Sequence, residues 1–413
     1  MAPIPDHQSP LLLLKRRWLW LAAFYVLAIL AVYGVLRRAD FGSAPQWLGQ
    51  TAVLAAYCLW LVWGHLPENH RSLPVTEPAE APVTSTGSVT VLPTFGLGNG
   101  LTLLRGLFVS MVAGFLFIPW PGGWLAWLPA LLYTIAAIAD FFDGYVARIT
   151  NHATQLGARL DMEFDGLGML VVSLLAVWFG QLPWWYLLIG LARYVFVAGM
   201  WLRQKRGLPN HTMPPSWHRR IFAGFQMGFM SVVLWPILPA VMATIAGTIF
   251  ALATSASFLR DWLVVVGWLD PQSSQYQRRQ QQLYHLFSLQ LPPVFRLIFA
   301  ACGLALISQL NTPWQPSNWM ALFTSWHLPG VAFIASFFAL TGLLAAVMIT
   351  LGMMGRTMAL VVMFPIGFEM ATTDASWLNG MAMVCATLIF LLGTGAFSVW
   401  QPEERFLVRR AGE

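Results

Sequence analysis

Long apolar stretches separated by short polar segments run through most of this chain. Twelve of them are predicted to form membrane-spanning helices, because each approaches the roughly 20 apolar residues that a bilayer core requires. These predicted spans are residues 18–36, 47–66, 101–119, 124–140, 157–179, 184–202, 221–238, 241–259, 294–310, 329–351, 357–370 and 378–400. The pattern predicts an all-α, polytopic integral membrane protein.

Two polar stretches divide the predicted spans into groups of two, six and four. The stretch at 68–95 is rich in Pro, Glu, Ser and Thr and cannot bury a core, so it is predicted to be a linker. The stretch at 269–292 contains a glutamine-rich run and is predicted to be a second, polar linker. The predicted regions are two helices at 1–67, the linker at 68–95, a six-helix domain at 96–268, the polar linker at 269–292, a four-helix domain at 293–402 and a tail at 403–413.

The composition excludes a water-soluble globular protein. Hydrophobic residues make up 58% of the chain and charged residues 10%, whereas soluble domains carry about a quarter charged residues. The net charge of +6 is typical of cytoplasmic loops beside anionic lipid, so no nucleic-acid partner is predicted. The distribution of Lys and Arg predicts that both termini lie in the cytoplasm. The expected location of this multi-pass protein is a bacterial inner membrane. The first apolar segment is predicted to be a span rather than a signal peptide, because no small-residue cleavage site follows it.

Acidic residues are concentrated in one short part of the predicted six-helix domain. Five of the 17 acidic residues lie within 26 residues, where an even distribution would place about one. They are Asp140, Asp143, Asp161, Glu163 and Asp165. The flanking segments are apolar, which puts these carboxylates at the membrane edge of two consecutive helices. Ionisable groups are costly at such a depth and are usually retained for function.

The helical repeat sorts these residues by face, since a helix turns by about 100° per residue. One face of the first helix carries Asp140, Asp143, Gly144 and Ala147. One face of the second carries Gly157, Asp161 and Asp165, whereas Glu163 points away from it. Because only a short turn joins the two helices, four aspartates are predicted to converge on one small volume.

Four converging carboxylates cannot all be ionised without cations, because like charges repel strongly where water is scarce. One or two divalent metal ions would compensate them. The ligands are all oxygen atoms, which favours Mg²⁺ or Mn²⁺ over zinc, and Mg²⁺ on carboxylates typically completes its coordination with the phosphates of a substrate. Small residues on the same faces leave room for a bulky ligand.

The two helices carry the pattern DxxDGxxAR, eight further residues and GxxxDxxxD, from Asp140 to Asp165. This pattern resembles the motif of the CDP-alcohol phosphotransferase family of integral membrane enzymes, with every fixed position filled. The resemblance covers residues 96–262, and its first helix has an NxLTxxR-like run ending at Arg105. The segment from Ser216 is similar to the basic start of the fifth helix in the phosphatidylglycerophosphate synthase branch, with Arg219 and Arg220 in place of lysines.

The resemblance implies an enzyme of phospholipid biosynthesis. Such an enzyme transfers a substituted phosphoryl group from a CDP-alcohol, most often CDP-diacylglycerol, to an acceptor alcohol and releases CMP. Glycerol 3-phosphate is the acceptor of the branch named above. The implied partners are this CDP-linked lipid donor, the alcohol acceptor and membrane lipids, and the resemblance allows a homodimer.

The resemblance also implies roles for individual residues. Two Mg²⁺ or Mn²⁺ ions would be held by Asp140, Asp143, Asp161 and Asp165, with Asp165 also serving as the general base. The implied CDP-binding residues are Asp143, Gly144, Ala147, Arg148, Gly157 and Asp161. Basic residues that could bind a phosphorylated acceptor are Arg105, Arg193, Arg219 and Arg220.

The last four predicted spans resemble DoxX-like four-helix membrane proteins, which often finish on a GxGxxS-type run, as at 393–398 here. Glu369 is the one acidic residue within the eleventh predicted span. An intramembrane carboxylate of this kind is either functional or bonded to a neighbouring helix.

Two other functions would also use an aspartate cluster. An intramembrane prenyltransferase binds a diphosphate through Mg²⁺ and aspartate pairs, but its first acidic motif has a different spacing and lacks the DGxxAR run. A polytopic cation transporter could use the aspartates as an ion site. Release of CMP, release of pyrophosphate and ion flux distinguish the three functions.

Overall fold

The computed structural model describes residues 9–71, 90–213, 217–310, 314–326, 328–373 and 376–403, without the side chains of 217–222, 309 and 310. Helices make up most of these residues and no β-strand occurs among them, which confirms the predicted all-α fold. In chain order the helices are α1 (Pro10–Arg38), α2 (Ala44–His65), η1 (Leu66–Glu68), α3 (Gly96–Ala113), η2 (Gly123–Trp127), α4 (Leu128–Ile149), α5 (Gln155–Trp178), η3 (Trp184–Tyr186), α6 (Leu187–Lys205), α7 (Trp217–Val233), α8 (Ala240–Val266), α9 (Ser274–His285), η4 (Leu286–Gln290), α10 (Leu291–Leu310), α11 (Pro316–Ser325), α12 (Val331–Leu351), α13 (Gly355–Thr372) and α14 (Trp377–Leu392).

Eight helical segments of the described chain are long and apolar enough to cross a membrane, which confirms a polytopic membrane protein. They are Pro10–Arg38, Ala44–Glu68, Gly96–Ala113, Gly123–Ile149, Trp184–Lys205, Ala240–Val266, Ser274–Ser308 and Val331–Leu351. Each of the twelve predicted spans overlaps a helix, and the count of twelve stays a prediction. Helix α5 is not among the eight because charged residues crowd its first three turns.

The polar stretch at 269–292 is helical over most of its length, which the sequence analysis did not predict. Helix α9 begins at the N-cap Ser273, whose hydroxyl accepts the backbone N–H of Tyr276. A single π-helical turn, η4, then connects α9 to α10. The glutamine-rich run therefore forms an exposed helix on which no residue is buried.

The chain divides into two compact units, Met1–Leu175 and Ala176–Glu413. The predicted six-helix domain at 96–268 contributes helices to both units, and its boundaries stay a prediction. Of the predicted linker at 68–95, residues 72–89 lie outside the described residues, as do 404–413 of the predicted tail.

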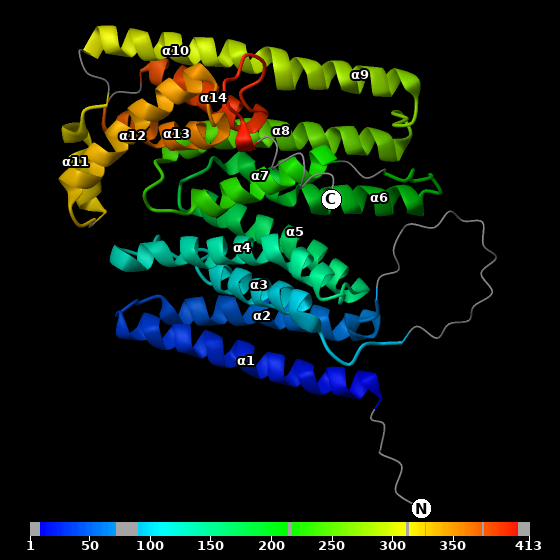
Figure 1. The fold of residues 1–413 in the computed structure, drawn as a ribbon. Helices are drawn as coiled ribbons and strands as arrows, with labels where there is room; N and C mark the ends of the chain where they lie inside the picture. The colour runs from blue at the N-terminus through cyan, green and yellow to red at the C-terminus, as the bar shows by residue number, and fades with distance from the viewer. Residues whose placement is uncertain are drawn as a thin grey trace, which may run out of the picture. The chain divides into compact units, whose positions relative to one another are not determined.

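In the first unit, helices α1 to α4 lie side by side in chain order (Figure 1). Polar groups on the apolar helices bond to backbone carbonyls of α3, because the membrane interior offers no water as a partner. Trp47 Nε1 on α2 donates to Met111 O at 3.1 Å, and Tyr25 Oη on α1 donates to Leu103 O. The two N-terminal helices thus pack directly on the helix that carries Arg105.

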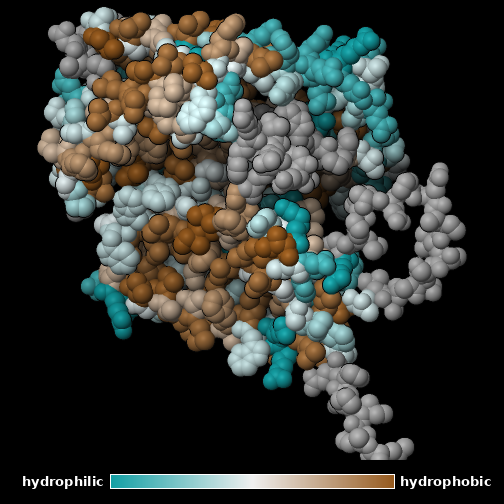
Figure 2. All heavy atoms as spheres, in the orientation of Figure 1, coloured by the Kyte–Doolittle hydropathy of each residue, from teal (hydrophilic) through white to brown (hydrophobic). Residues whose placement is uncertain are grey.

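The outer sides of the helices are apolar. Helix α1 buries few residues and exposes large side chains such as Trp20 (69% exposed) and Leu27 (67%). In the space-filling view, hydrophobic residues cover broad parts of the visible helical surface (Figure 2). Such side chains can remain exposed only where lipid rather than water surrounds them.

In the second unit, α8 packs against α13 and α14, where Gly367 lies in close contact with Met242. The buried charged residues described in this unit include Glu369 and Arg296. Glu369 accepts a hydrogen bond from Trp319 Nε1 at 3.0 Å, so this carboxylate bonds to the neighbouring helix α11. Arg296 donates to the carbonyls of Ile349 and Thr350 at the end of α12 and to that of Thr394, and so stabilises a helix terminus and the loop at 393–398.

Candidate active site

The candidate site lies within the first unit, where α4 and α5 are joined by a tight turn at 150–154. The turn reverses the chain at Asn151, which has φ +49°, a left-handed conformation that Asn tolerates better than most residues. Thr154 then caps α5, because its Oγ1 accepts the backbone N–H of Gly157 at 3.0 Å. The turn brings the last turns of α4 beside the first turns of α5.

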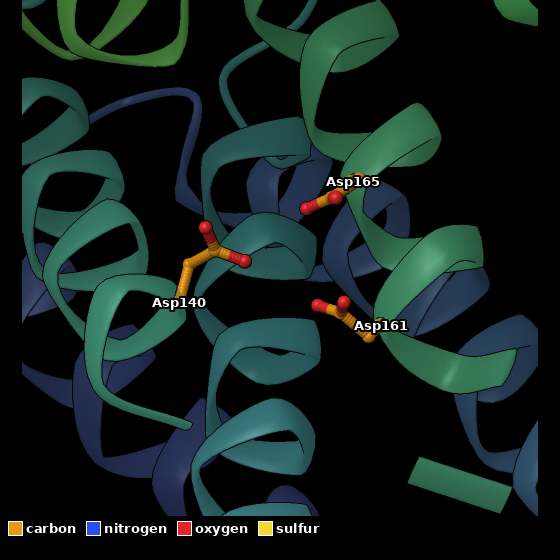
Figure 3. Close-up of side chains that lie close together, drawn as sticks. All are labelled: Asp140, Asp161 and Asp165. Atoms are coloured by element: carbon orange, nitrogen blue, oxygen red, sulfur yellow. The ribbon is translucent and has the colours of Figure 1, made fainter. Parts of the chain in front are cut away.

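Three of the four predicted aspartates come together at this place. One carboxylate oxygen from each of Asp140, Asp161 and Asp165 lies within 4.8 Å of the other two, and all three side chains are half-buried. Figure 3 shows Asp140 on α4 facing Asp161 and Asp165 on α5. Among the described residues this is the one group of at least three acidic, histidine or cysteine side chains with this spacing, and Glu163 is outside it.

The guanidinium of Arg105 on α3 lies in the middle of this group. Its Nη2 is 2.8 Å from Asp161 Oδ1, and its Nη1 contacts Asp140 and lies 3.3 Å from Asp165 Oδ1. Nη2 also donates to the backbone carbonyl of Asp161 at 2.9 Å. Arg105 is 3% exposed, so it holds the carboxylates of two helices from below the surface that a substrate could reach.

Asp143 is the fourth predicted aspartate, and it lies deeper than the others. Asp143 is 7% exposed, and its Oδ2 accepts a hydrogen bond from Thr102 Oγ1 at 2.8 Å. The same oxygen is 3.8 Å from Arg105 Nη1. Asp143 therefore belongs to the charged cluster through α3, while its oxygens are not part of the close group of three.

The donor set fits a divalent cation. Four carboxylates face one guanidinium, which leaves a negative excess of three charges around a half-buried volume. Carboxylate oxygens at this spacing are the ligands that Mg²⁺ and Mn²⁺ take, whereas zinc and copper favour nitrogen and sulfur. A bound divalent ion would neutralise two of the three negative charges that Arg105 leaves uncompensated.

The predicted CDP-binding residues fall into two groups. Gly144 has open space: a β-carbon added there would meet only Arg148 Nη1, at the ordinary contact distance of 3.5 Å. Ala147 packs on Gly98 of α3, and a β-carbon on Gly157 would collide with Asn99 Oδ1. The small size of Ala147 and Gly157 thus serves helix packing, while Gly144 and the exposed Arg148 face free volume.

The predicted acceptor-binding arginines lie on three different helices, α3, α6 and α7. Arg105 bonds to the aspartates, a role in charge compensation that the sequence analysis did not predict. Arg193 is a half-buried residue of α6 in the second unit. Arg219 and Arg220 are on α7, and their side chains lie outside the described residues. Acceptor binding by these residues stays a prediction.

Hydrogen-bonding residues around the cluster were missed as site residues. Thr102 and Asn99 precede Arg105 at intervals of three, a spacing that places all three on one side of α3 and could have identified them. Thr154 could have been identified as an N-cap residue before a helical pattern. Asn69, which bonds to Asn99, lies in the predicted linker, where no pattern marks it.

Comparisons with known proteins agree with the motif. The family model for CDP-alcohol phosphatidyltransferase matches residues 95–265. A protein of Mycobacterium tuberculosis designated a candidate cardiolipin synthase is 28% identical over 157 residues, which cover 37% of this chain and 69% of that protein. No solved structure matches this chain.

Two further relatives carry the name CDP-diacylglycerol–glycerol-3-phosphate 3-phosphatidyltransferase. The protein from Cereibacter sphaeroides is 35% identical over 129 residues, covering 30% of this chain and 58% of that protein. The protein from Salmonella choleraesuis is 28% identical over 148 residues, covering 34% of this chain and 78% of that protein. These matches leave more than half of the present chain uncovered.

Proposed function

We propose that this protein transfers the phosphatidyl group of CDP-diacylglycerol to glycerol 3-phosphate and releases CMP. The match of residues 95–265 to the family model for CDP-alcohol phosphatidyltransferase supports this reaction class. The observation that carries the proposal is the cluster of Asp140, Asp161 and Asp165 around Arg105, which lies inside the matched segment. The acceptor is taken from the names of the relatives in Cereibacter and Salmonella.

The proposed cofactor is Mg²⁺ or Mn²⁺, in one or two ions held by Asp140, Asp143, Asp161 and Asp165. When bound, the metal would neutralise the pyrophosphate of the donor and polarise the phosphorus that is attacked. Arg105 keeps the carboxylates of α4 and α5 at a fixed separation, and the hydrogen bond from Thr102 orients Asp143.

Asp165 is the proposed general base. Its side chain is 40% exposed, so an acceptor hydroxyl can approach it, and its Oδ1 lies 3.3 Å from Arg105 Nη1. The acceptor oxygen attacks the phosphorus that carries diacylglycerol, the bond from that phosphorus to the phosphate of CMP breaks, and Asp165 takes the hydroxyl proton. CMP leaves with the electron pair of the broken bond.

The cytidine and its phosphates are proposed to lie over the open side of α4, beside Gly144 and Arg148. Arg148 is exposed and lies along the last turn of α4, where a guanidinium can pair with a phosphate in a bidentate manner. The site is proposed to open to the cytoplasmic side of a bacterial inner membrane.

Gly144, which faces open space, and Gly157, which packs against Asn99, provide a test of the donor position. Gly144→Ala is expected to keep the stability of the protein, because the added methyl group meets no backbone, and to raise the KM for CDP-diacylglycerol by about 10-fold if the nucleotide lies there. Gly157→Ala is expected to lower the free energy of unfolding by about 1–3 kcal/mol, because Asn99 must move. Thermal unfolding and steady-state kinetics of both variants measure this contrast, and an unchanged KM in Gly144→Ala would contradict the donor position.

The acceptor is tested by product analysis. Purified protein in detergent is offered CDP-diacylglycerol and Mg²⁺ with glycerol 3-phosphate, phosphatidylglycerol, inositol phosphate, inositol or serine in separate reactions. The expected result is phosphatidylglycerophosphate, formed with glycerol 3-phosphate alone. Formation of cardiolipin from phosphatidylglycerol would instead assign the activity named for the mycobacterial relative. If neither glycerol 3-phosphate nor phosphatidylglycerol gave a product, the proposed acceptor class would be contradicted.

A further inference from the structure

The short segment after α2 lies against the turn that joins the two aspartate-bearing helices. We call residues 68–71 the strap. The carbonyl of His70 accepts the backbone N–H of Gln155 at 3.0 Å, and Arg71 forms an isolated antiparallel bridge with Thr154. Glu68 Oε1 accepts from Arg159 Nη1 at 3.3 Å. The strap therefore contacts the start of α5 through backbone and side-chain groups.

Asn69 is the buried centre of the strap. Its side-chain amide donates to the carbonyls of Leu92 at 3.0 Å and Thr94 at 2.8 Å, which uses both of its N–H groups. Its backbone carbonyl accepts the N–H of Leu92 at 2.7 Å. Because Asn69 is 0% exposed, no water replaces these partners if the amide is removed. Asn69 thus joins the end of α2 to the chain that enters α3.

A line of hydrogen bonds runs from Asn69 to the first turn of α5. Asn99 Nδ2 on α3 donates to Asn69 Oδ1 at 3.4 Å and to Thr154 Oγ1 at 2.8 Å. Thr154 Oγ1 in turn accepts the N–H of Gly157. All of these groups are buried, so each bond depends on its neighbours for orientation. The line connects α2, α3 and α5 at one end of the aspartate cluster.

The hydrogen-bonded line lies close enough to the aspartate cluster to affect the positions of its side chains. Asp161 lies two turns after Thr154 on α5, and Arg105 lies two turns after Asn99 on α3. A shift of the first turn of α5 relative to α3 would change the separation of Asp161 from Arg105 and Asp140. Misplacement of reacting groups by about 1 Å can cost on the order of 10²-fold in rate.

We infer that the strap is a positioning element of the active site, and that Asn69 sets the place of Asp161 and Asp165 through Asn99 and Thr154. The strap lies outside the segment that the family model matches, which begins at residue 95. The N-terminal helices therefore supply part of the catalytic unit, in addition to lipid contact. The inference rests on the proposed function for the reaction that the positioning serves.

The test compares Asn69→Ala with Asn379→Ala, which removes an equally buried amide from α14 in the second unit. Asn69→Ala is expected to weaken Mn²⁺ binding, measured from the electron paramagnetic resonance signal of free Mn²⁺, by about 10-fold, as loss of groups that orient metal ligands does. Its kcat for CMP release is expected to fall by about 10- to 100-fold with the KM for the acceptor within twofold. Asn379→Ala is expected to match the wild type in both measurements.

A second pair of variants keeps the test decisive if Asn69→Ala does not fold. Thr154→Val has nearly the same shape but cannot accept from Asn99 or Gly157, whereas Thr154→Ser retains the hydroxyl. Thr154→Val is expected to reproduce the loss of Mn²⁺ affinity and Thr154→Ser to restore it. Wild-type Mn²⁺ affinity and kcat in both Asn69→Ala and Thr154→Val would overturn the inference. A wild-type protein that forms no CMP, with Mn²⁺ affinity still lowered in these variants, would refute the proposed reaction and support the positioning role.

Discussion

Replacing Asp165 by asparagine is expected to lower the rate of CMP formation by about 10²- to 10⁴-fold, the usual contribution of a general base. Asparagine has the same shape as aspartate and can bond to neighbouring groups, so the fold should persist. It cannot take a proton from the acceptor hydroxyl at neutral pH, and it replaces one of the three close carboxylates by a neutral amide. The measurement is the initial rate of Mg²⁺-dependent CMP release, with size-exclusion chromatography as the check on folding.

Glu163→Gln is the matched control for Asp165→Asn. Glu163 lies two residues earlier on the same helix and is not part of the close group formed by Asp140, Asp161 and Asp165. This variant is expected to keep most of the wild-type rate. If Glu163→Gln and Asp161→Asn lost the rate of CMP release equally, the catalytic residues of α5 would not be confined to the face turned toward Asp140.

Replacing Arg105 by methionine is expected to destabilise the protein more than any other change of a single charge in the first unit. Methionine fills much of the same volume but leaves four carboxylates facing one another. Breaking a buried ion pair costs about 3–5 kcal/mol, and we expect about 3 kcal/mol here because Asp161 and Asp165 are partly exposed. Thermal unfolding in detergent with a metal chelator measures this loss.

Divalent cations should compensate part of the Arg105→Met effect. Since the bound ion replaces the missing positive charge, adding millimolar Mg²⁺ is expected to raise the unfolding temperature of Arg105→Met more than that of the wild type. The control Arg38→Met changes an exposed arginine at the end of α1 and should alter stability by less than about 0.5 kcal/mol. Equal stability of Arg105→Met and Arg38→Met would show that Arg105 does not compensate the cluster.

The sequence predicted the helices and the aspartate cluster because both depend on local periodicity. A long apolar stretch in a membrane must satisfy its backbone hydrogen bonds internally and so becomes helical. Each of the twelve apolar stretches overlaps a helix. The spacing of Asp140 and Asp143, then of Asp161 and Asp165, places their oxygens on facing sides once a short turn is assumed. The structure brings Asp140, Asp161 and Asp165 together in this way.

The role of Arg105 and the strap could not be predicted in the same way. The sequence analysis predicts an acceptor-binding role for Arg105 because a basic residue of the predicted six-helix domain can bind a phosphate group. Its contact with the aspartates depends on how α3 packs against α4 and α5, which is set by close approaches such as that of Gly98 to Ala147. Asn69 and Thr154 are 85 residues apart in the chain, and composition alone assigned Asn69 to a linker.

Metal dependence of CMP release tests the central claim most directly. Wild-type protein freed of metal with a chelator is incubated with CDP-diacylglycerol and glycerol 3-phosphate, before and after Mg²⁺ is restored, beside Asp161→Asn under the same conditions. The account predicts CMP only in the wild-type sample that contains Mg²⁺. CMP release at the same rate without metal, or in Asp161→Asn at the wild-type rate, would contradict it.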